Sequence, residues 1–249
     1  MTKISVVTAV YNRKHTVAYA LDSVLSQTYP NVEPVVIDGA STDGTRDVLE
    51  LYRARIPVLV SEPDKGIYDA LNKGIRHSNG DVVGFLHADD LFAHDAVLQR
   101  IASAFEALDV EAVYGDLVYV DKSDPSRIVR YWKAGTFDAA KLRQGWMPPH
   151  PTFYVRRKVY ERLGLFDTRY RIAADYDSIV RFLFLAGISV AYIPEVLVRM
   201  RVGGASNRSL VSIACKSRED YDILQRHGVG GLPTLLRKNF SKLGQFWTR

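Results

Sequence analysis

Residues 4–25 read ISVVTAVYNRKHTVAYALDSVL and combine a strand pattern with a helix pattern. Residues 4–10 form a short, nearly continuous apolar run, which is typical of a β-strand buried on both faces. In residues 17–25 the apolar positions recur every three or four residues, as on one face of an α-helix. A strand that leads into a helix in this way is the repeating unit of a parallel sheet.

The same alternation continues to residue 108. Strands are predicted at 35–37, 57–60 and 82–86, and helices at 67–75 and 95–108. A further helix, which Ser41 or Thr42 is expected to cap, carries Val48, Leu49 and Tyr52. The pattern predicts an α/β fold with a mostly parallel central sheet that helices flank on both faces. Later residues are less regular, with a helix at 175–186 and a strand at 190–193.

Composition is typical of a soluble globular protein, with 47% hydrophobic and 24% charged residues. The single cysteine, Cys215, cannot form an internal disulfide, and no charged-then-apolar leader opens the chain, so we expect a cytoplasmic protein. Apolar stretches fall short of the roughly 20 residues that cross a bilayer. The net charge of +5 suits nucleic acid, anionic lipid or an anionic substrate equally well.

Acidic residues follow three of the predicted strands: Asp38, Asp64 and the pair Asp89 and Asp90. The carboxyl ends of parallel strands share one edge of a sheet, where ligands bind. Two adjacent carboxylates after an apolar strand are costly to bury unless a cation is present. This arrangement predicts a metal site, although one of the pair could instead cap the next helix if Asp95 does not.

Several motifs occur in an ordered series along the chain. They are Thr8-Ala-Val-Tyr-Asn12, Ser26-Gln-Thr-Tyr-Pro30, Val36-Ile-Asp-Gly-Ala-Ser-Thr-Asp-Gly-Thr45, Asp64-Lys-Gly-Ile-Tyr-Asp-Ala-Leu-Asn-Lys-Gly74, Gly80-Asp81 and Phe85-Leu-His-Ala-Asp-Asp90. In this order and spacing the chain resembles the family 2 glycosyltransferases, which have the GT-A fold. Further on, Gly164-Leu-Phe-Asp167, Ala174-Asp-Tyr-Asp177 and Arg181 resemble the acceptor-side motif of that family.

The resemblance runs over residues 3–206 and implies a division of the chain. We expect a GT-A domain at 1–205, with a nucleotide-sugar-binding half at 1–110 and an acceptor-side half at 111–205. A basic, helical tail at 206–249 would follow.

The resemblance also implies which residues bind the nucleotide-sugar donor. Thr8, Tyr11 and Asp38 would surround the base, since an aromatic ring can stack on it and a carboxylate can accept its imino N–H. Arg13 and Lys65 would contact the diphosphate. The remaining donor-binding positions are Asn12, Gly66, Asn72, His87, Ala88 and Asp89.

One motif departs from the family pattern. In the family's Asp-x-Asp motif the carboxylates bind metal and ribose, whereas here His87 replaces the first acid. Asp89 and Asp90 remain as ligands for Mn²⁺ or Mg²⁺, which would stabilise the departing diphosphate. His87 could bind ribose, reach the metal or serve a structural role. Leu71 stands where many relatives have arginine, so the phosphate contacts are expected to differ.

The resemblance also implies that Asp175 is the catalytic base, the carboxylate that would take the proton of the attacking hydroxyl. Ala174 stands where the family usually has an acid. Asp177 would point elsewhere, since helix positions two apart do not face each other. A direct displacement with one base implies inversion at the anomeric carbon. Alignment with the family places His150 and Asp177, and the turn Gly203-Gly-Ala-Ser206, on the acceptor or diphosphate side.

The sequence thus predicts an inverting, metal-dependent hexosyl- or N-acetylhexosaminyltransferase that uses a nucleotide-sugar, with UDP as the first choice. The acceptor would be a saccharide or a lipid-linked saccharide of a surface polysaccharide. The tail at 232–249 is basic and apolar, which fits peripheral contact with the inner face of the membrane, packing on the domain or contact in a homodimer.

Three other functions compete with this prediction. A nucleotidyltransferase would need a glycine-rich phosphate loop, and the sequence contains none of the usual patterns. An inactive sugar-nucleotide-binding homologue would account for His87 and Leu71. A basic nucleic-acid-binding protein has no need for Asp89, Asp90 and Asp175 in one cleft, so nucleic acid is not an expected partner.

Overall fold

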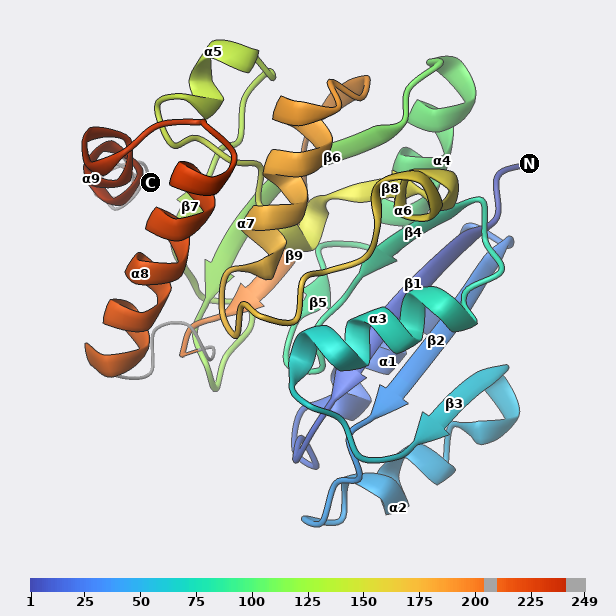
Figure 1. The fold of residues 1–249 in the computed structure, drawn as a ribbon. Helices are drawn as coiled ribbons and strands as arrows, with labels where there is room; N and C mark the ends of the chain where they lie inside the picture. The colour runs from blue at the N-terminus through green and yellow to red at the C-terminus, as the bar shows by residue number, and fades with distance from the viewer. Residues whose placement is uncertain (204–209, 241–249) are drawn as a thin grey trace.

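The computed structural model describes residues 1–203 and 210–240, which fold into an α/β structure with a curled sheet flanked by helices (Figure 1). The strands are β1 (Ile4–Val10), β2 (Val32–Asp38), β3 (Val58–Ser61), β4 (Val82–Phe85), β5 (Leu91–Phe92), β6 (Ala112–Val120), β7 (Ile128–Trp132), β8 (Tyr154–Arg156) and β9 (Val190–Arg201). The α-helices are α1 (Val17–Leu25), α2 (Thr45–Glu50), α3 (Ile67–His77), α4 (Val97–Ala107), α5 (Ala139–Leu142), α6 (Arg157–Leu163), α7 (Ala174–Ile179), α8 (Leu210–Arg226) and α9 (Leu232–Phe240). Short 3₁₀ turns occur at η1 (Arg53–Arg55) and η2 (His150–Thr152), and α7 continues into the π-helix η3 (Val180–Leu185).

The strand order in the sheet is β3-β2-β1-β4-β8-β6-β9-β5, with β7 also paired to β6. Strands β1 to β4 pair in parallel, and Val7 of β1 lies between Val35 of β2 and Phe85 of β4. Beyond β4 the sheet is mixed, because β8 runs antiparallel to both of its neighbours whereas β9 runs parallel to β6. The predicted α/β class with its parallel first half is confirmed.

The start of α2 differs from the prediction. Its N-cap is Gly44 in the left-handed region, at φ 90°, which glycine adopts without steric cost. Neither Ser41 nor Thr42 therefore caps the helix. The Ser41 hydroxyl instead donates to the carboxylate of Asp38 at 2.5 Å and so holds the loop that follows β2.

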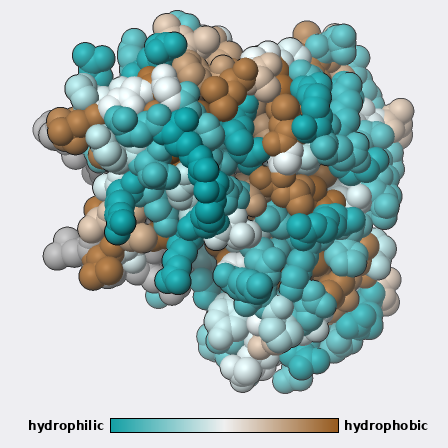
Figure 2. Space-filling model, viewed as in Figure 1, coloured by the Kyte–Doolittle hydropathy of each residue, from teal (hydrophilic) through white to brown (hydrophobic). Residues whose placement is uncertain are grey.

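The C-terminal helices pack on the domain. Ile223 and Leu224 of α8 are fully buried in the same core as the α3 face of the sheet, and Leu235 of α9 is nearly buried. Leu232 and Leu236 of α9 are exposed. Hydrophobic and hydrophilic atoms both lie at the edge of the molecule where this helix is found (Figure 2). Residues 241–249 of the predicted tail, and 204–206 of the glycine turn, lie outside the described residues.

None of the helices in the described part of the chain is long and apolar enough to cross a membrane.

Candidate active site

A cleft of about 840 Å³ opens at the carboxyl ends of the parallel strands. Its first wall consists of the loops that follow β1, β3 and β4, which supply Tyr11, Asp64 and residues 87–90. The facing wall comes from η2, α7 and the end of β9, and it includes His150, Asp175 and Arg201. Of the acidic residues predicted to share one sheet edge, Asp64, Asp89 and Asp90 line this cleft, whereas Asp38 does not.

Asp90 lies at the bottom of this cleft with an exposed fraction of 1%. Its Oδ1 accepts the backbone N–H of Arg201 at 3.0 Å, whereas its Oδ2 is buried and has no hydrogen-bond partner among the described residues. Burial, reinforced by the neighbouring charge of Asp89, raises the pKa of Asp90 well above its usual value. Asp89 is more open, and its Oδ2 lies 3.6 Å from the guanidinium Nε of Arg13.

The carboxylates of Asp89 and Asp90 suit a cation that also binds a phosphate group of the substrate. Within residues 1–203 and 210–240 there is no group of three or more His, Cys, Asp or Glu side chains that could hold a metal ion without other ligands. Magnesium, however, is commonly bound by one or two carboxylates together with substrate phosphates. The unpartnered Oδ2 of Asp90 beside Asp89 fits that type of site.

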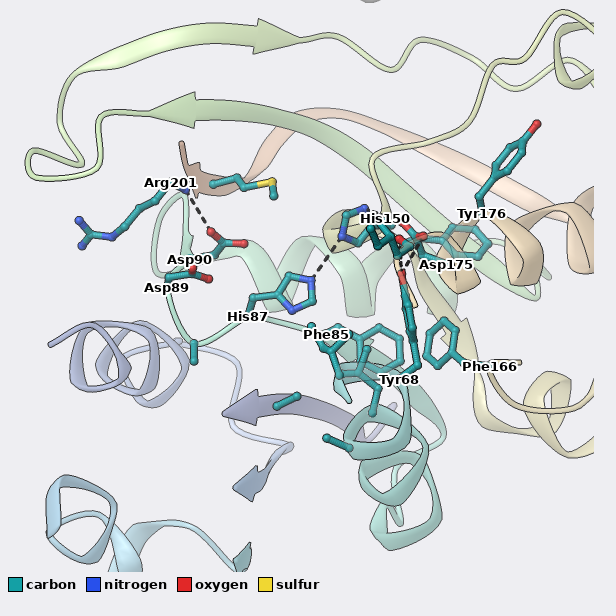
Figure 3. Close-up of a pocket in the computed structure, with 18 of the residues that line it drawn as sticks. Tyr68, Phe85, His87, Asp89, Asp90, His150, Phe166, Asp175, Tyr176 and Arg201 are labelled. Carbon is teal, nitrogen blue, oxygen red and sulfur yellow. Dashed lines mark hydrogen bonds and ion pairs between the residues drawn. The ribbon is translucent and has the colours of Figure 1, made fainter. Parts of the chain in front are cut away.

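Asp175 stands in the first turn of α7 and is held by two side chains (Figure 3). Its Oδ2 lies 3.1 Å from Nδ1 of His150, and its Oδ1 accepts the hydroxyl of Tyr68 at 3.1 Å. His150 in turn lies close to His87, with 3.3 Å between the two Nε2 atoms. These four side chains form a connected row from α3 through α7 and η2 to the loop after β4.

His87 is neutral at neutral pH. Burial, and then the proximity of His150, lower the pKa of His87 to about 4. When His150 donates Nδ1–H to Asp175, its Nε2 is the acceptor for the Nε2–H of His87. Nδ1 of His87 is then a buried acceptor, and no described group donates to it. His87 therefore links the two walls of the cleft by hydrogen bonding without adding charge.

Comparison with known proteins identifies the family. Residues 5–164 match the sequence model described as Glycosyl transferase family 2. The chain belongs to this family. The PGL/p-HBAD biosynthesis glycosyltransferase of Mycobacterium tuberculosis is 30% identical over 192 residues, which cover 75% of this chain and 72% of that protein. The chain is thus a glycosyltransferase, as its motifs predict.

Solved structures show the GT-A fold. The UDP-GlcNAc complex of S. aureus TarS 1–349 has a TM-score of 0.70 at 17% identity and covers 91% of this chain. The match covers 66% of that TarS chain, just under two thirds of its length. The mannosyltransferase PcManGT from Pyrobaculum calidifontis, in complex with GDP-Man and Mn²⁺, has a TM-score of 0.68 at 20% identity and covers 99% of this chain and 71% of its own.

Only part of the predicted donor-binding set lines the cleft of this glycosyltransferase. The lining members are Tyr11, Arg13, Gly66, His87, Ala88 and Asp89. Thr8 is buried in β1, and Lys65 is exposed outside the lining. Asp38 is fully buried, and both of its carboxylate oxygens accept hydroxyls, one from Ser41 and one from Ser61.

Asn12 and Asn72, which were both predicted to bind the donor, form side-chain hydrogen bonds with backbone groups of the protein. Asn12 adopts φ 51° and accepts the N–H of Thr42, which fixes the loop after β1. Asn72 donates to the carbonyl of Phe166 and accepts its N–H, both at 2.9 Å. The structure thus gives both asparagines positioning contacts outside the cleft lining.

Asp177, predicted on the acceptor side, is placed away from the cleft. Its carboxylate is nearly buried between the Nε of Arg181 at 2.8 Å and the Nε2 of His227 at 2.7 Å. This is an ion-pair arrangement that satisfies a buried charge. Asp175 and Asp177 therefore face different surroundings, as expected from their helical spacing.

Some cleft residues were not predicted. Tyr68 falls inside the quoted motif at 64–74, but no role is predicted for it from the sequence. Arg201 and Lys216 also line the cleft, from the end of β9 and from α8. Their only signal in the sequence is positive charge, which does not distinguish them from surface residues.

Proposed function

We propose that this glycosyltransferase transfers a sugar from a UDP-sugar to the hydroxyl of a saccharide or lipid-linked saccharide, with inversion and with the help of Mn²⁺ or Mg²⁺. The observation that supports this best is that Asp89, Asp90 and Asp175, from separate parts of the chain, line one cleft. The complexes of TarS with UDP-GlcNAc and of PcManGT with GDP-Man and Mn²⁺ support a nucleotide-sugar donor.

On the donor side, Tyr11 and Arg13 are the residues best placed to bind the nucleotide. The Tyr11 ring lines the cleft with 58% of its surface exposed, so one face is available for stacking on a base. The Arg13 guanidinium can pair with a phosphate. Asp38 and Asn12 support the loops that carry these residues. A divalent cation at Asp89 and Asp90 would supply charge stabilisation for the leaving diphosphate.

On the acceptor side, Asp175 takes the proton of the acceptor hydroxyl as its oxygen attacks the anomeric carbon. The glycosidic bond forms while the sugar–phosphate bond breaks, and the nucleoside diphosphate leaves with the electron pair. Tyr68 and His150 hold both carboxylate oxygens of Asp175 in place. Because the attack comes from the side opposite the leaving group, an α-linked donor gives a β-glycoside.

A substitution and a donor panel test this proposal. In Asp175→Asn we expect kcat to fall by about 10²- to 10⁴-fold, the usual contribution of a general base, while donor binding is kept. Asp109→Asn, at an exposed site after α4, is the matched control. Full turnover in Asp175→Asn would reject the base. The panel compares UDP- and GDP-sugars with and without Mn²⁺ by thermal shift, since a ligand of the native state raises its melting temperature.

We also propose that the protein acts at the inner face of the membrane, where α9 makes a peripheral contact. Exposed Leu232 and Leu236 lie on this helix with Arg237, a combination that favours anionic lipid surfaces. Co-sedimentation with anionic vesicles but not with neutral vesicles is the expected result. Light scattering that gives twice the monomer mass, without vesicle binding, would instead favour a homodimer.

A further inference from the structure

Helix α8 lies alongside the segment that carries Asp175 (Figure 1). This helix is outside residues 5–164, which match the family's sequence model. Its side chains contact the segment at several points. Asp222 accepts the hydroxyl of Tyr170 at 2.7 Å, and His227 pairs with Asp177 at 2.7 Å.

The central contact is made by Glu219. One carboxylate oxygen accepts the backbone N–H of Arg171, and the other accepts the N–H groups of Ile172 and Ala173, all at 2.9 Å. These residues immediately precede α7, whose first turn contains Asp175. Hydrogen bonds to an ionised acceptor are about twice as strong as neutral ones, so three of them hold this backbone firmly.

The same backbone is held from its other side by Tyr68. The Tyr68 hydroxyl shares its single proton between two acceptors, the carbonyl of Ile172 at 2.7 Å and the carboxylate of Asp175 at 3.1 Å. Ile172 is therefore fixed at its N–H by α8 and at its carbonyl by α3. Movement of Glu219 would change the position of the Asp175 carboxylate relative to its hydrogen-bond partners.

Helix α8 is itself anchored next to Glu219. Asp220 is fully buried and accepts hydrogen bonds from Lys216 and Lys238, each at 2.7 Å. The ammonium of Lys238 also lies 2.9 Å from the ring centre of Tyr176, the residue after Asp175. The helix therefore has a fixed position from which Glu219 can act.

We propose that Glu219 is a positioning residue for the catalytic carboxylate of Asp175, so that α8 contributes to the active site. This inference rests on the proposed role of Asp175 as the base. An alternative role for Glu219 is to stabilise the N-terminus of α7 without affecting catalysis, since acidic groups favour helix N-termini. The two roles differ in what their loss does to turnover by the folded enzyme.

The test substitutes Glu219→Gln and Glu219→Asp. Glutamine keeps the shape but loses the charge and one acceptor, and aspartate keeps the charge but is one methylene shorter. We expect kcat per folded molecule to fall about tenfold or more in both, because small misplacements of catalytic groups can cost up to about 10²-fold. The KM for the donor should stay unchanged. Glu161→Gln, on the exposed face of α6, is the matched control.

A double variant separates this inference from the proposed function. If Glu219 acts through Asp175, adding Glu219→Gln to Asp175→Asn should lower the residual rate no further, because residues that act as a unit are not additive. Wild-type kcat in both single variants, or an equal loss in the Asp175→Asn background, would overturn the inference. Wild-type turnover in Asp175→Asn alone would reject the base itself.

Discussion

Lys238→Met is expected to destabilise the protein more than any exposed charge substitution, and its magnitude follows from burial. Lys238 and Asp220 have exposed fractions of 1% and 0%, and their charged atoms lie 2.7 Å apart. Methionine fills a similar volume but leaves the Asp220 charge without this partner. Removal of one partner of a buried pair typically costs about 3–5 kcal/mol.

The lower end of that range applies here, because Asp220 keeps Lys216 at 2.7 Å. We therefore expect the free energy of unfolding to fall by about 3 kcal/mol. For a chain of this size that corresponds to a fall in melting temperature of about 6–12 °C. Arg53→Gln, which breaks an exposed pair with Glu50, should leave the free energy of unfolding almost unchanged, because solvent screens that pair.

The difference between Lys238→Met and the wild type should also depend on pH. Burial alone would raise the pKa of Asp220, but the charges of Lys238 and Lys216 outweigh it, so the pKa is lowered. A carboxyl group with a lowered pKa contributes stability above its unfolded pKa and loses it as pH falls through the folded pKa. The destabilisation should therefore be complete at neutral pH and shrink in acid.

Urea denaturation of the wild type and of Lys238→Met, at neutral and at acid pH, measures the difference in their free energies of unfolding. The double variant with both Asp220→Leu and Lys238→Met is the key control. Replacing both partners of a buried pair by apolar groups often changes the free energy of unfolding very little. If Lys238→Met stays within about 1 kcal/mol of the wild type at neutral pH, the buried pair does not hold α9 against α8 and the reasoning is refuted.

Three further substitutions test the site itself. In His150→Ala, Asp175 loses its Oδ2 contact, so steady-state kinetics should show kcat lowered about tenfold at an unchanged donor KM, and a change in KM alone would contradict this. Asp90→Asn should abolish the additional thermal stabilisation that Mn²⁺ gives in the presence of a nucleotide, because the buried ligand charge is gone; a persisting metal effect would exclude this site. Asn72→Ala should lower the free energy of unfolding by about 2 kcal/mol through loss of two hydrogen bonds to Phe166, and a raised donor KM would instead support the donor-binding role predicted from the sequence.

The fold could be predicted where a periodic pattern determines the structure. Residues 4–10 and 17–25 form β1 and α1 with the predicted boundaries, because each pattern buries a continuous apolar face. Strand β9 instead continues to Arg201, well past the predicted end at residue 193, through pairing with β6 that its own sequence does not reveal. The start of α2 was missed because it depends on the backbone conformation of Gly44.

The site could be predicted only in part, for a related reason. Residue type and position at a strand end indicate that Asp38, Asp89 and Asp90 belong to the sheet edge, and all three are found there. The sequence does not indicate which carboxylates already accept hydrogen bonds from other side chains of the protein. Asp38 is one of them, since it accepts the hydroxyls of Ser41 and Ser61. Tyr68 was missed because its partner Asp175 is 107 positions away in the chain.

The departure of His87 from the family motif has a physical explanation in this cleft. The walls already contain Asp89, Asp90 and Asp175. A carboxylate at position 87 would add another buried negative charge, which is costly without a partner. A neutral imidazole avoids that cost, and its Nε2 can bond to His150, which itself contacts Asp175. We infer that His87 provides a hydrogen-bonded link between the loop proposed to bind the metal and Asp175, the proposed base.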